Sequence, residues 1–174
     1  RALREIGLAA GEPPVRRGFP PSVFAELPRL FERAGNDATG SITGIYTVLI
    51  EDEEGDDPIA EEVRSILDGH VVLSRKLGAA GHYPAIDVLG SLSRLFPRLA
   101  DPAHRDAATR VRALLAKHAE IEFLVQVGEY RAGADPLADR AIAAKPEIDS
   151  LLRQDANRAE DFQTSLMLLR GVAG

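Results

Sequence analysis

The sequence has no cysteine and no tryptophan among its 174 residues. Without cysteine, no disulfide framework and no thiolate metal site can form. A basic surface is missing too, because the formal net charge is −6, and this argues against a nucleic-acid-binding domain. Aromatic residues make up only 5%, so aliphatic side chains must fill the core. No apolar run approaches the length of a membrane span.

Two kinds of site motif are also missing. The sequence contains no Gly-x-x-x-x-Gly-Lys-Ser/Thr motif, so these residues cannot build a phosphate cradle. The four histidines show no ligand spacing, and we interpret them as packing or surface groups and expect no metal site: His70, His82, His104 and His118. The length fits one domain, or one domain with a smaller satellite.

Helices and strands are expected to alternate in the first hundred residues. Residues 1–10 and 22–34 have helical spacing, the second interrupted by Pro28, and a proline-rich loop separates them. The β-branched run from Ser41 to Ile50 predicts a strand buried on both faces, as in a parallel sheet. Asp57-Pro58 then starts a helix, and a short strand, Val71 to Leu73, completes a βαβ pattern.

Beyond residue 100 the composition predicts helices only. Asp101-Pro102 opens a long helix that reaches about Val127, and its inward positions are expected to be Ala108, Val111, Leu115, Leu124 and Val125. Asp135-Pro136 opens a short helix that Pro146 should end, and two further helices are expected near residues 148–152 and 162–169. We therefore predict an α/β domain over residues 1–100 and a small helical domain over residues 101–174.

The candidate site residues are Tyr83 and Arg94. Tyr83 lies in a loop bounded by Gly81 and Pro84, and Arg94 follows eleven residues later. A tyrosine ring offers a flat face for a nucleotide base, and a guanidinium offers a rigid fork of donors for phosphate. From the residues alone the alternatives also stay open, because a lone Tyr-Pro is more often a packing corner and a lone arginine is usually a solvated surface group.

Long motifs in a fixed order favour the nucleotide interpretation of Tyr83 and Arg94 by resemblance. The sequence resembles the C-terminal half of the hexameric ATPases that power type III protein secretion, which are relatives of the flagellar export ATPase and of the rotary ATP synthase α and β subunits. The resemblance extends from residue 1 to about 154. Its motifs are Gly11-Glu12-Pro13-Pro14, Arg17 to Phe24, Gly40-Ser41-Ile42-Thr43, Asp57-Pro58-Ile59-Ala60 and Asp68 to Arg94.

The resemblance implies a fold and a set of roles. The fold would be the C-terminal part of a RecA-like P-loop ATPase domain with a mostly parallel sheet, followed by a small all-α domain. Tyr83 would pack on adenine, and Arg94 would be the arginine finger. ATP and Mg²⁺ would be bound mainly by residues that lie upstream in the family, so we expect a C-terminal fragment that is inactive alone.

The resemblance also implies partners and a location. Such ATPases form homohexamers on a central stalk protein, respond to an ATPase regulator, and release and unfold chaperone-bound effectors at the cytoplasmic face of the bacterial inner membrane. The acidic run from Glu51 to Asp57 holds six acids in seven positions. It would face the central channel and its stalk, although a solvated, self-repelling loop explains it equally well.

Three other assignments stay open at the level of sequence. The nearest is a flagellar export ATPase, although the acidic stretch before Pro58 favours the virulence branch. A rotary synthase subunit is less favoured, because the synthase's Asp-Glu-Leu-Ser-Glu-Glu-Asp run is replaced by residues 128–133 and the aromatic expected near Gln154 is not evident. From a different class, the chain could be a non-enzymatic module that binds the stalk or a chaperone.

Overall fold

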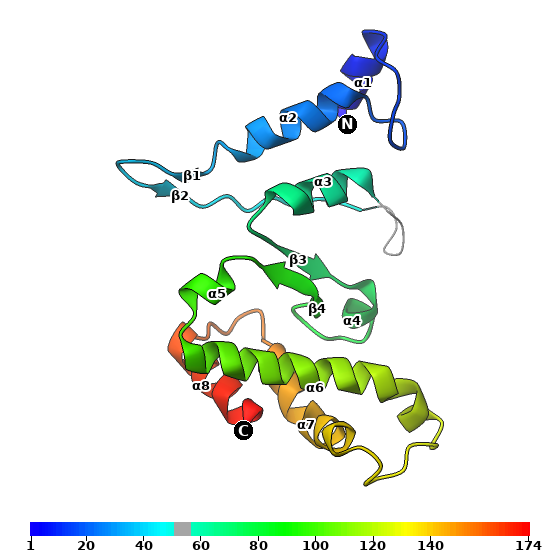
Figure 1. Ribbon diagram of the computed structural model, residues 1–174, viewed down its shortest axis with the longest axis vertical. Coiled ribbons are helices and arrows are strands. Elements are labelled where there is room, and N and C mark those ends of the chain that lie inside the picture. Colours follow the sequence, from blue (N-terminus) through cyan, green and yellow to red (C-terminus); the bar gives the residue numbers. More distant parts are fainter. Residues whose placement is uncertain (51–56) are drawn as a thin grey trace. The chain divides into compact units, whose positions relative to one another are not determined.

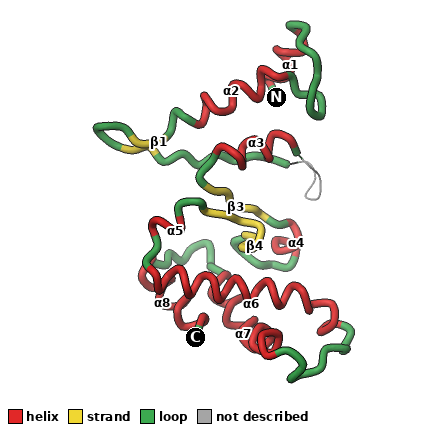
Figure 2. Tube along the Cα trace, viewed as in Figure 1, coloured by secondary structure: helices red, strands yellow, loops and turns green. Residues whose placement is uncertain are grey.

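The computed structural model describes residues 1–50 and 57–174, so the acidic residues 51–56 lie outside the described part of the chain. The chain divides into two compact units, residues 1–68 and 69–174. The first unit and the start of the second contain both helices and short strands, and the rest of the second is helical (Figures 1 and 2). The expected mixed class of helix and strand is therefore confirmed.

The first unit contains three helices and one short antiparallel pair. Its elements are α1 (Ala2–Ala9), α2 (Pro21–Phe31), β1 (Gly35–Asn36), β2 (Ser41–Ile42) and α3 (Pro58–Ile66). Helix α1 packs on α2 through Gly7, where a Cβ atom would come within 2.7 Å of Cγ of the buried Pro20. Pro28 lies inside α2 rather than ending it. Asp57 caps α3 as expected, because its carboxylate accepts hydrogen bonds from the Ile59 and Ala60 amides at 2.9 and 3.1 Å.

The long strand expected from Ser41 to Ile50 is wrong in the described structure. Only β2 forms, and it pairs antiparallel with β1 through two residues. Residues 43–50 form no regular structure, and Ile45 and Leu49 are 92% and 87% exposed. A strand buried on both faces needs neighbours along both edges, and the described residues provide none for this stretch. β-Branched composition alone therefore overestimated the strand.

The second unit begins with an antiparallel hairpin. Strand β3 (Gly69–Leu73) leads through α4 (Arg75–Ala79) into β4 (Ile86–Ser93), which pairs back on β3 from Leu73↔Ile86 to Gly69↔Ser93. We expected a strand at 71–73 but took it for the second strand of a βαβ unit, and we did not expect β4. Both sheets of the described residues are antiparallel pairs, so the mostly parallel sheet is not observed there.

Three helices follow the short α5 (Phe96–Leu99): α6 (Pro102–Gln126), α7 (Pro136–Leu152) and α8 (Phe162–Ala173). Figure 1 shows α6 with the hairpin β3–β4 on one side and α7 and α8 on the other. The helices enclose a core in which Ile148 is fully buried, and its buried members are Ala107, Val111, Leu114, Ala141, Ile148 and Ala173. No helix among the described residues is long and apolar enough to cross a membrane.

Two expectations for these helices were wrong. The buried stripe of α6 is Ala107, Val111, Leu114 and Ile121. The expected Val111 is confirmed and Leu115 packs against the core, whereas Leu124 and Val125 are exposed. Helix α7 also continues through Pro146 to Leu152. Ala141 and Ile148 are both fully buried, one on each side of Pro146, and their packing outweighs the roughly 3 kcal/mol that an internal proline costs.

Candidate functional site

The loop that carries Tyr83 is fixed at both ends. The Ser74 amide donates to the Ala85 carbonyl at 2.8 Å, which closes the loop at its base. Inside it, the His82 amide donates to the Leu77 carbonyl at 2.9 Å, and the buried His82 ring lies 3.2 Å from the Pro84 carbonyl through Nδ1. His82 is thus a packing group, as expected, and it sets the position of its neighbour Tyr83.

A pocket lies between this loop and a second segment far along the chain. It has a volume of about 620 Å³, within the range of small-molecule sites, and is lined by Tyr83, Pro84 and residues 154–159. The Gln154 amide donates to the Tyr83 carbonyl at 2.9 Å, so the two walls are joined directly. The site therefore pairs the Tyr83 loop with the connection between α7 and α8.

The second wall is held by its own hydrogen bonds. The Asp155 carboxylate accepts from the Asn157 amide at 2.7 Å, and the Gln154 side chain donates to the Arg158 carbonyl at 2.9 Å. Arg158 in turn forms an ion pair with Glu160 at 2.7 Å. These bonds give residues 154–159 a defined shape.

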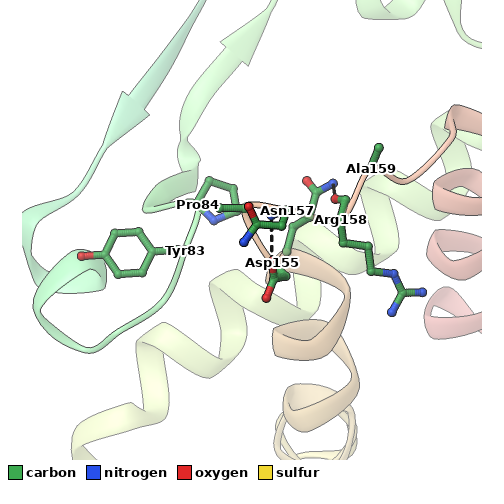
Figure 3. A pocket seen from close by; sticks show the side chains of 8 residues that line it. Tyr83, Pro84, Asp155, Asn157, Arg158 and Ala159 are labelled. Carbon is green, nitrogen blue, oxygen red and sulfur yellow. Dashed lines mark hydrogen bonds between the residues drawn. The ribbon is translucent and has the colours of Figure 1, made fainter.

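The Tyr83 ring projects to one side of its loop, away from the turn that carries Asp155 and Asn157 (Figure 3). Tyr83 is 61% exposed, so a ligand can cover part of its ring. An exposed aromatic at the edge of a preformed pocket suits a flat ring such as a nucleotide base.

Arg94 lies at the other end of β4. It follows Ser93 directly and precedes α5, and it is exposed. The two ends of β4 pair with Leu73 and Gly69, which are four residue steps apart on β3. At a rise of about 3.3 Å per residue, the ends of β4 are therefore roughly 13 Å apart. Tyr83 and Arg94 lie beyond opposite ends, so the structure does not bring the two predicted site residues together.

Between these ends, β4 departs from regular pairing. His70 pairs with Leu92 and Val72 with Asp87, so residues 88–91 bulge out opposite Val71. The Asp87 carboxylate accepts from the Leu89 and Gly90 amides, both at 3.0 Å, and closes the bulge into a turn. The spacing of Asp87, Gly90 and Ser91 is a turn signal that sequence reasoning missed.

The described residues contain no group of three or more His, Cys, Asp or Glu side chains that could hold a metal ion. Sequence reasoning also missed residues 154–159 as a wall of the pocket. No local signal could have found them, because Gln154 meets Tyr83 only through the packing of the helical segment. Only the resemblance had pointed to the position near Gln154.

Two family models match the chain in succession. The nucleotide-binding domain of the ATP synthase alpha/beta family matches residues 1–93, and the T3SS EscN ATPase C-terminal domain matches residues 100–171. A type 3 secretion system ATPase of Xanthomonas euvesicatoria is 60% identical over 172 residues, which cover 99% of this chain and 39% of that protein. The chain therefore spans about two fifths of the length of this curated relative.

Solved structures give the same result. The assembled ATPase EscN of the type III secretion system from enteropathogenic E. coli matches with a TM-score of 0.96 and 46% identity, over 100% of this chain and 42% of that one. EscN in complex with its central stalk EscO matches with a TM-score of 0.87 and 45% identity, over 100% of this chain and 41% of that one. These matches confirm the resemblance inferred from the sequence motifs.

Proposed function

Because this chain belongs to the ATP synthase alpha/beta family, we propose that it is part of a type 3 secretion system ATPase, which couples ATP hydrolysis to the release and unfolding of exported proteins. The relative from Xanthomonas supports this branch of the family over 99% of the chain. Residues 1–100 would be the C-terminal part of a RecA-like domain and residues 101–174 the helical domain. The two family models, which meet between residues 93 and 100, support this division.

The observation that carries the proposal is the pocket in which Tyr83 meets residues 154–159. We expect the adenine ring to stack on the exposed face of Tyr83 at the edge of this pocket, beside a wall that its own hydrogen bonds hold in shape. Preformed walls lower the entropic cost of binding a base. ATP would enter with its base at Tyr83, and Mg²⁺ would be held mainly by residues that lie upstream of this segment in the resembled ATPases.

Arg94 would act on the site of a neighbouring subunit. An arginine finger stabilises the charge that develops on the transferred phosphoryl group, and a planar guanidinium suits that role. The two ends of β4 are roughly 13 Å apart, and Tyr83 and Arg94 lie beyond opposite ends, so Arg94 is separated from the base pocket of its own chain. In a head-to-tail ring of identical subunits, each chain can present its base pocket on one edge and Arg94 on the other.

The partners follow from the same assignment. The protein would assemble as a homohexamer around a central stalk, as the solved complex of EscN with EscO suggests, and would meet an ATPase regulator and chaperone–effector complexes. It would work at the cytoplasmic face of the bacterial inner membrane. The acidic run from Glu51 to Asp57 would face the stalk, and the net charge of −6 gives no support to a nucleic-acid partner.

The test is ATP hydrolysis by the full-length ring carrying Arg94→Ala. We expect the turnover number to fall by about 10³-fold or more, because that is the range of an arginine finger. The KM for ATP should stay near its original value, since the base pocket is untouched. Arg94→Lys should restore little, because an ammonium group lacks the planar fork.

Arg98→Ala is the matched control, since Arg98 is an exposed arginine four residues further along, in the last turn of α5. Its turnover should equal that of the unmodified ring. If Arg94→Ala rings hydrolyse ATP at the original rate, the assignment of Arg94 is wrong.

A further inference from the structure

The bulge of β4 ends at Ser91, two paired residues before Arg94, and its backbone is held by several side chains. The carbonyl oxygens of Asp87, which precedes the bulge, and of all four bulge residues, 88–91, accept a hydrogen bond from a side chain. The Ser91 hydroxyl donates to the Asp87 carbonyl and accepts from the Val72 amide at 2.9 Å. The His70 Nε2 atom donates to the Gly90 carbonyl at 3.1 Å. The segment is therefore fixed from several directions.

Arg112 supplies the three remaining bonds. Its guanidinium donates to the carbonyls of Val88 and Leu89, the latter at 3.2 Å, and reaches the Ser91 carbonyl at 3.5 Å. Hydrogen bonds from a charged donor are stronger than neutral ones, and a guanidinium can span several acceptors at once. One side chain of α6 thus closes the bulge, which paired residues Leu92 and Ser93 connect to Arg94.

The backbone of Arg112 is itself fixed by the helical core. Its neighbours Val111 and Leu114 are 4% and 3% exposed and pack into the core that α6 shares with α7 and α8. The guanidinium therefore extends from a rigid helix to the opposite side, toward β4. Through these hydrogen bonds, Arg112 fixes the bulge relative to the helical core.

Helix α6 also holds the chain on the other side of Arg94. The Phe96 ring at the start of α5 lies edge-on to His104, with ring centroids 5.0 Å apart, and Arg105 donates to the Pro97 carbonyl at 2.9 Å. Arg105 and Arg112 are seven residues apart, which is about two helical turns and places them on the same face of α6. The short segment that carries Arg94 is therefore held at both ends by one helix.

We propose that Arg112 is a positioning residue for Arg94, and that α6 sets where the Arg94 guanidinium meets the neighbouring subunit. The proposal rests on the proposed function, since it takes Arg94 as the arginine finger. A finger must reach the reacting phosphoryl group with high accuracy, because a misplacement of about 1 Å can cost 10²-fold in rate. The hydrogen bonds from Arg112 to the bulge, here called the clamp, would supply that accuracy. They come from α6, which does not itself carry the finger.

The experiment compares full-length rings carrying Arg112→Ala, Arg112→Lys or Arg110→Ala. For Arg112→Ala we expect the turnover number to fall by about 10- to 100-fold, with ring assembly, melting temperature and the KM for ATP nearly unchanged. Arg112→Lys should recover part of the rate, because an ammonium can serve one or two of the three carbonyls. Arg110→Ala is the control, since Arg110 bonds Asp106 and the Gly174 carbonyl and should keep full turnover.

Single-turnover rates of the double variant Arg112→Ala/Arg94→Ala distinguish a positioning role of Arg112 from a merely structural one. If Arg112 acts through Arg94, the double variant should hydrolyse ATP at the rate of Arg94→Ala alone. A further fall by the same factor, or full turnover in Arg112→Ala, would overturn the proposal. If Arg112→Ala rings fail to assemble, the proposal is tested with Arg112→Lys and Arg105→Ala instead. Unimpaired turnover in both variants would overturn the proposal, and reduced turnover with an unchanged KM would support it.

Failure of the proposed function gives a different result. Arg94→Ala alone would then keep its turnover, and the clamp would have no finger to position. If instead Arg94→Ala is inactive and Arg112→Ala is fully active, the finger stands and only the clamp is wrong.

Discussion

Replacing Tyr83 with alanine should weaken ATP binding without slowing the chemical step. The side chain is 61% exposed, so about 100–150 Å² of a tyrosine's usual buried area remains for a ligand. A base that covers one face would bury roughly half of it, which at about 25 cal/mol per Å² is worth approximately 1.3–1.9 kcal/mol. That value lies within the range of about 1–3 kcal/mol measured for a base stacked on an aromatic side chain.

The predicted effect is a rise of about 10- to 25-fold in the KM for ATP, since 1.4 kcal/mol corresponds to a factor of ten. The assay is steady-state hydrolysis by the full-length ring, with Tyr83→Phe as the matched control. Phenylalanine keeps the aromatic face, so its KM should change by less than about twofold. Because the ring is exposed, its removal should leave the melting temperature nearly unchanged.

An unchanged KM in Tyr83→Ala would refute the stacking argument, and Tyr83 would then be a packing corner of its loop. A fall in turnover with constant KM would also contradict it, because Tyr83 lies far from Arg94 along β4.

Two further predictions concern the helical core. Ile148→Ala should lower the free energy of unfolding of the 174-residue chain by about 2–5 kcal/mol in denaturant titrations, because Ile148 is fully buried. Met167→Ala is the control, since Met167 is exposed. An equal loss of stability in both variants would contradict the assignment of the core. Lys117 donates to the Asp135 carboxylate at 3.0 Å, and this bond, followed by those from the Ala138 and Leu137 amides, holds the pKa of Asp135 below its ordinary 3.8. Since folding depresses this pKa, its stabilisation is present above pH 3.8 and is lost as the pH falls through the folded-state value. Asp135→Asn, which can still cap α7, should therefore destabilise the chain at neutral pH by a margin that shrinks in acid; a margin that grows in acid would contradict this.

Features set by neighbouring residues could be predicted from the sequence. The Asp-Pro pairs at 57–58, 101–102 and 135–136 each begin a helix, because a cap needs only its own side chain and the next few amides. The same holds for the end of α6, where Gly128 adopts a φ of +74° that favours glycine. These signals act over three or four residues and do not depend on the rest of the fold.

Features set by distant partners could not be predicted. Residues 43–50 have strand composition, but a ladder requires a partner that the described residues do not provide. The continuation of α7 through Pro146 depends on the burial of Ala141 and Ile148 against other helices. The bulge before Arg94 depends on Arg112, which follows Ser91 by twenty-one residues, and the pocket depends on Gln154, which meets Tyr83 across the second unit. The candidate residues were named from their chemistry, and their roles from the resemblance, whereas their surroundings required the structure.

The most direct test of the central claim is activity in mixed rings. Arg94→Ala subunits are combined with subunits whose phosphate loop is inactivated, and each kind is inactive alone. If Arg94 serves the neighbouring subunit, some interfaces in the mixed ring join an intact phosphate loop to an intact Arg94, so part of the ATP hydrolysis should return. If mixed rings form and remain inactive, Arg94 acts within its own subunit or is structural, and the account of this site is wrong.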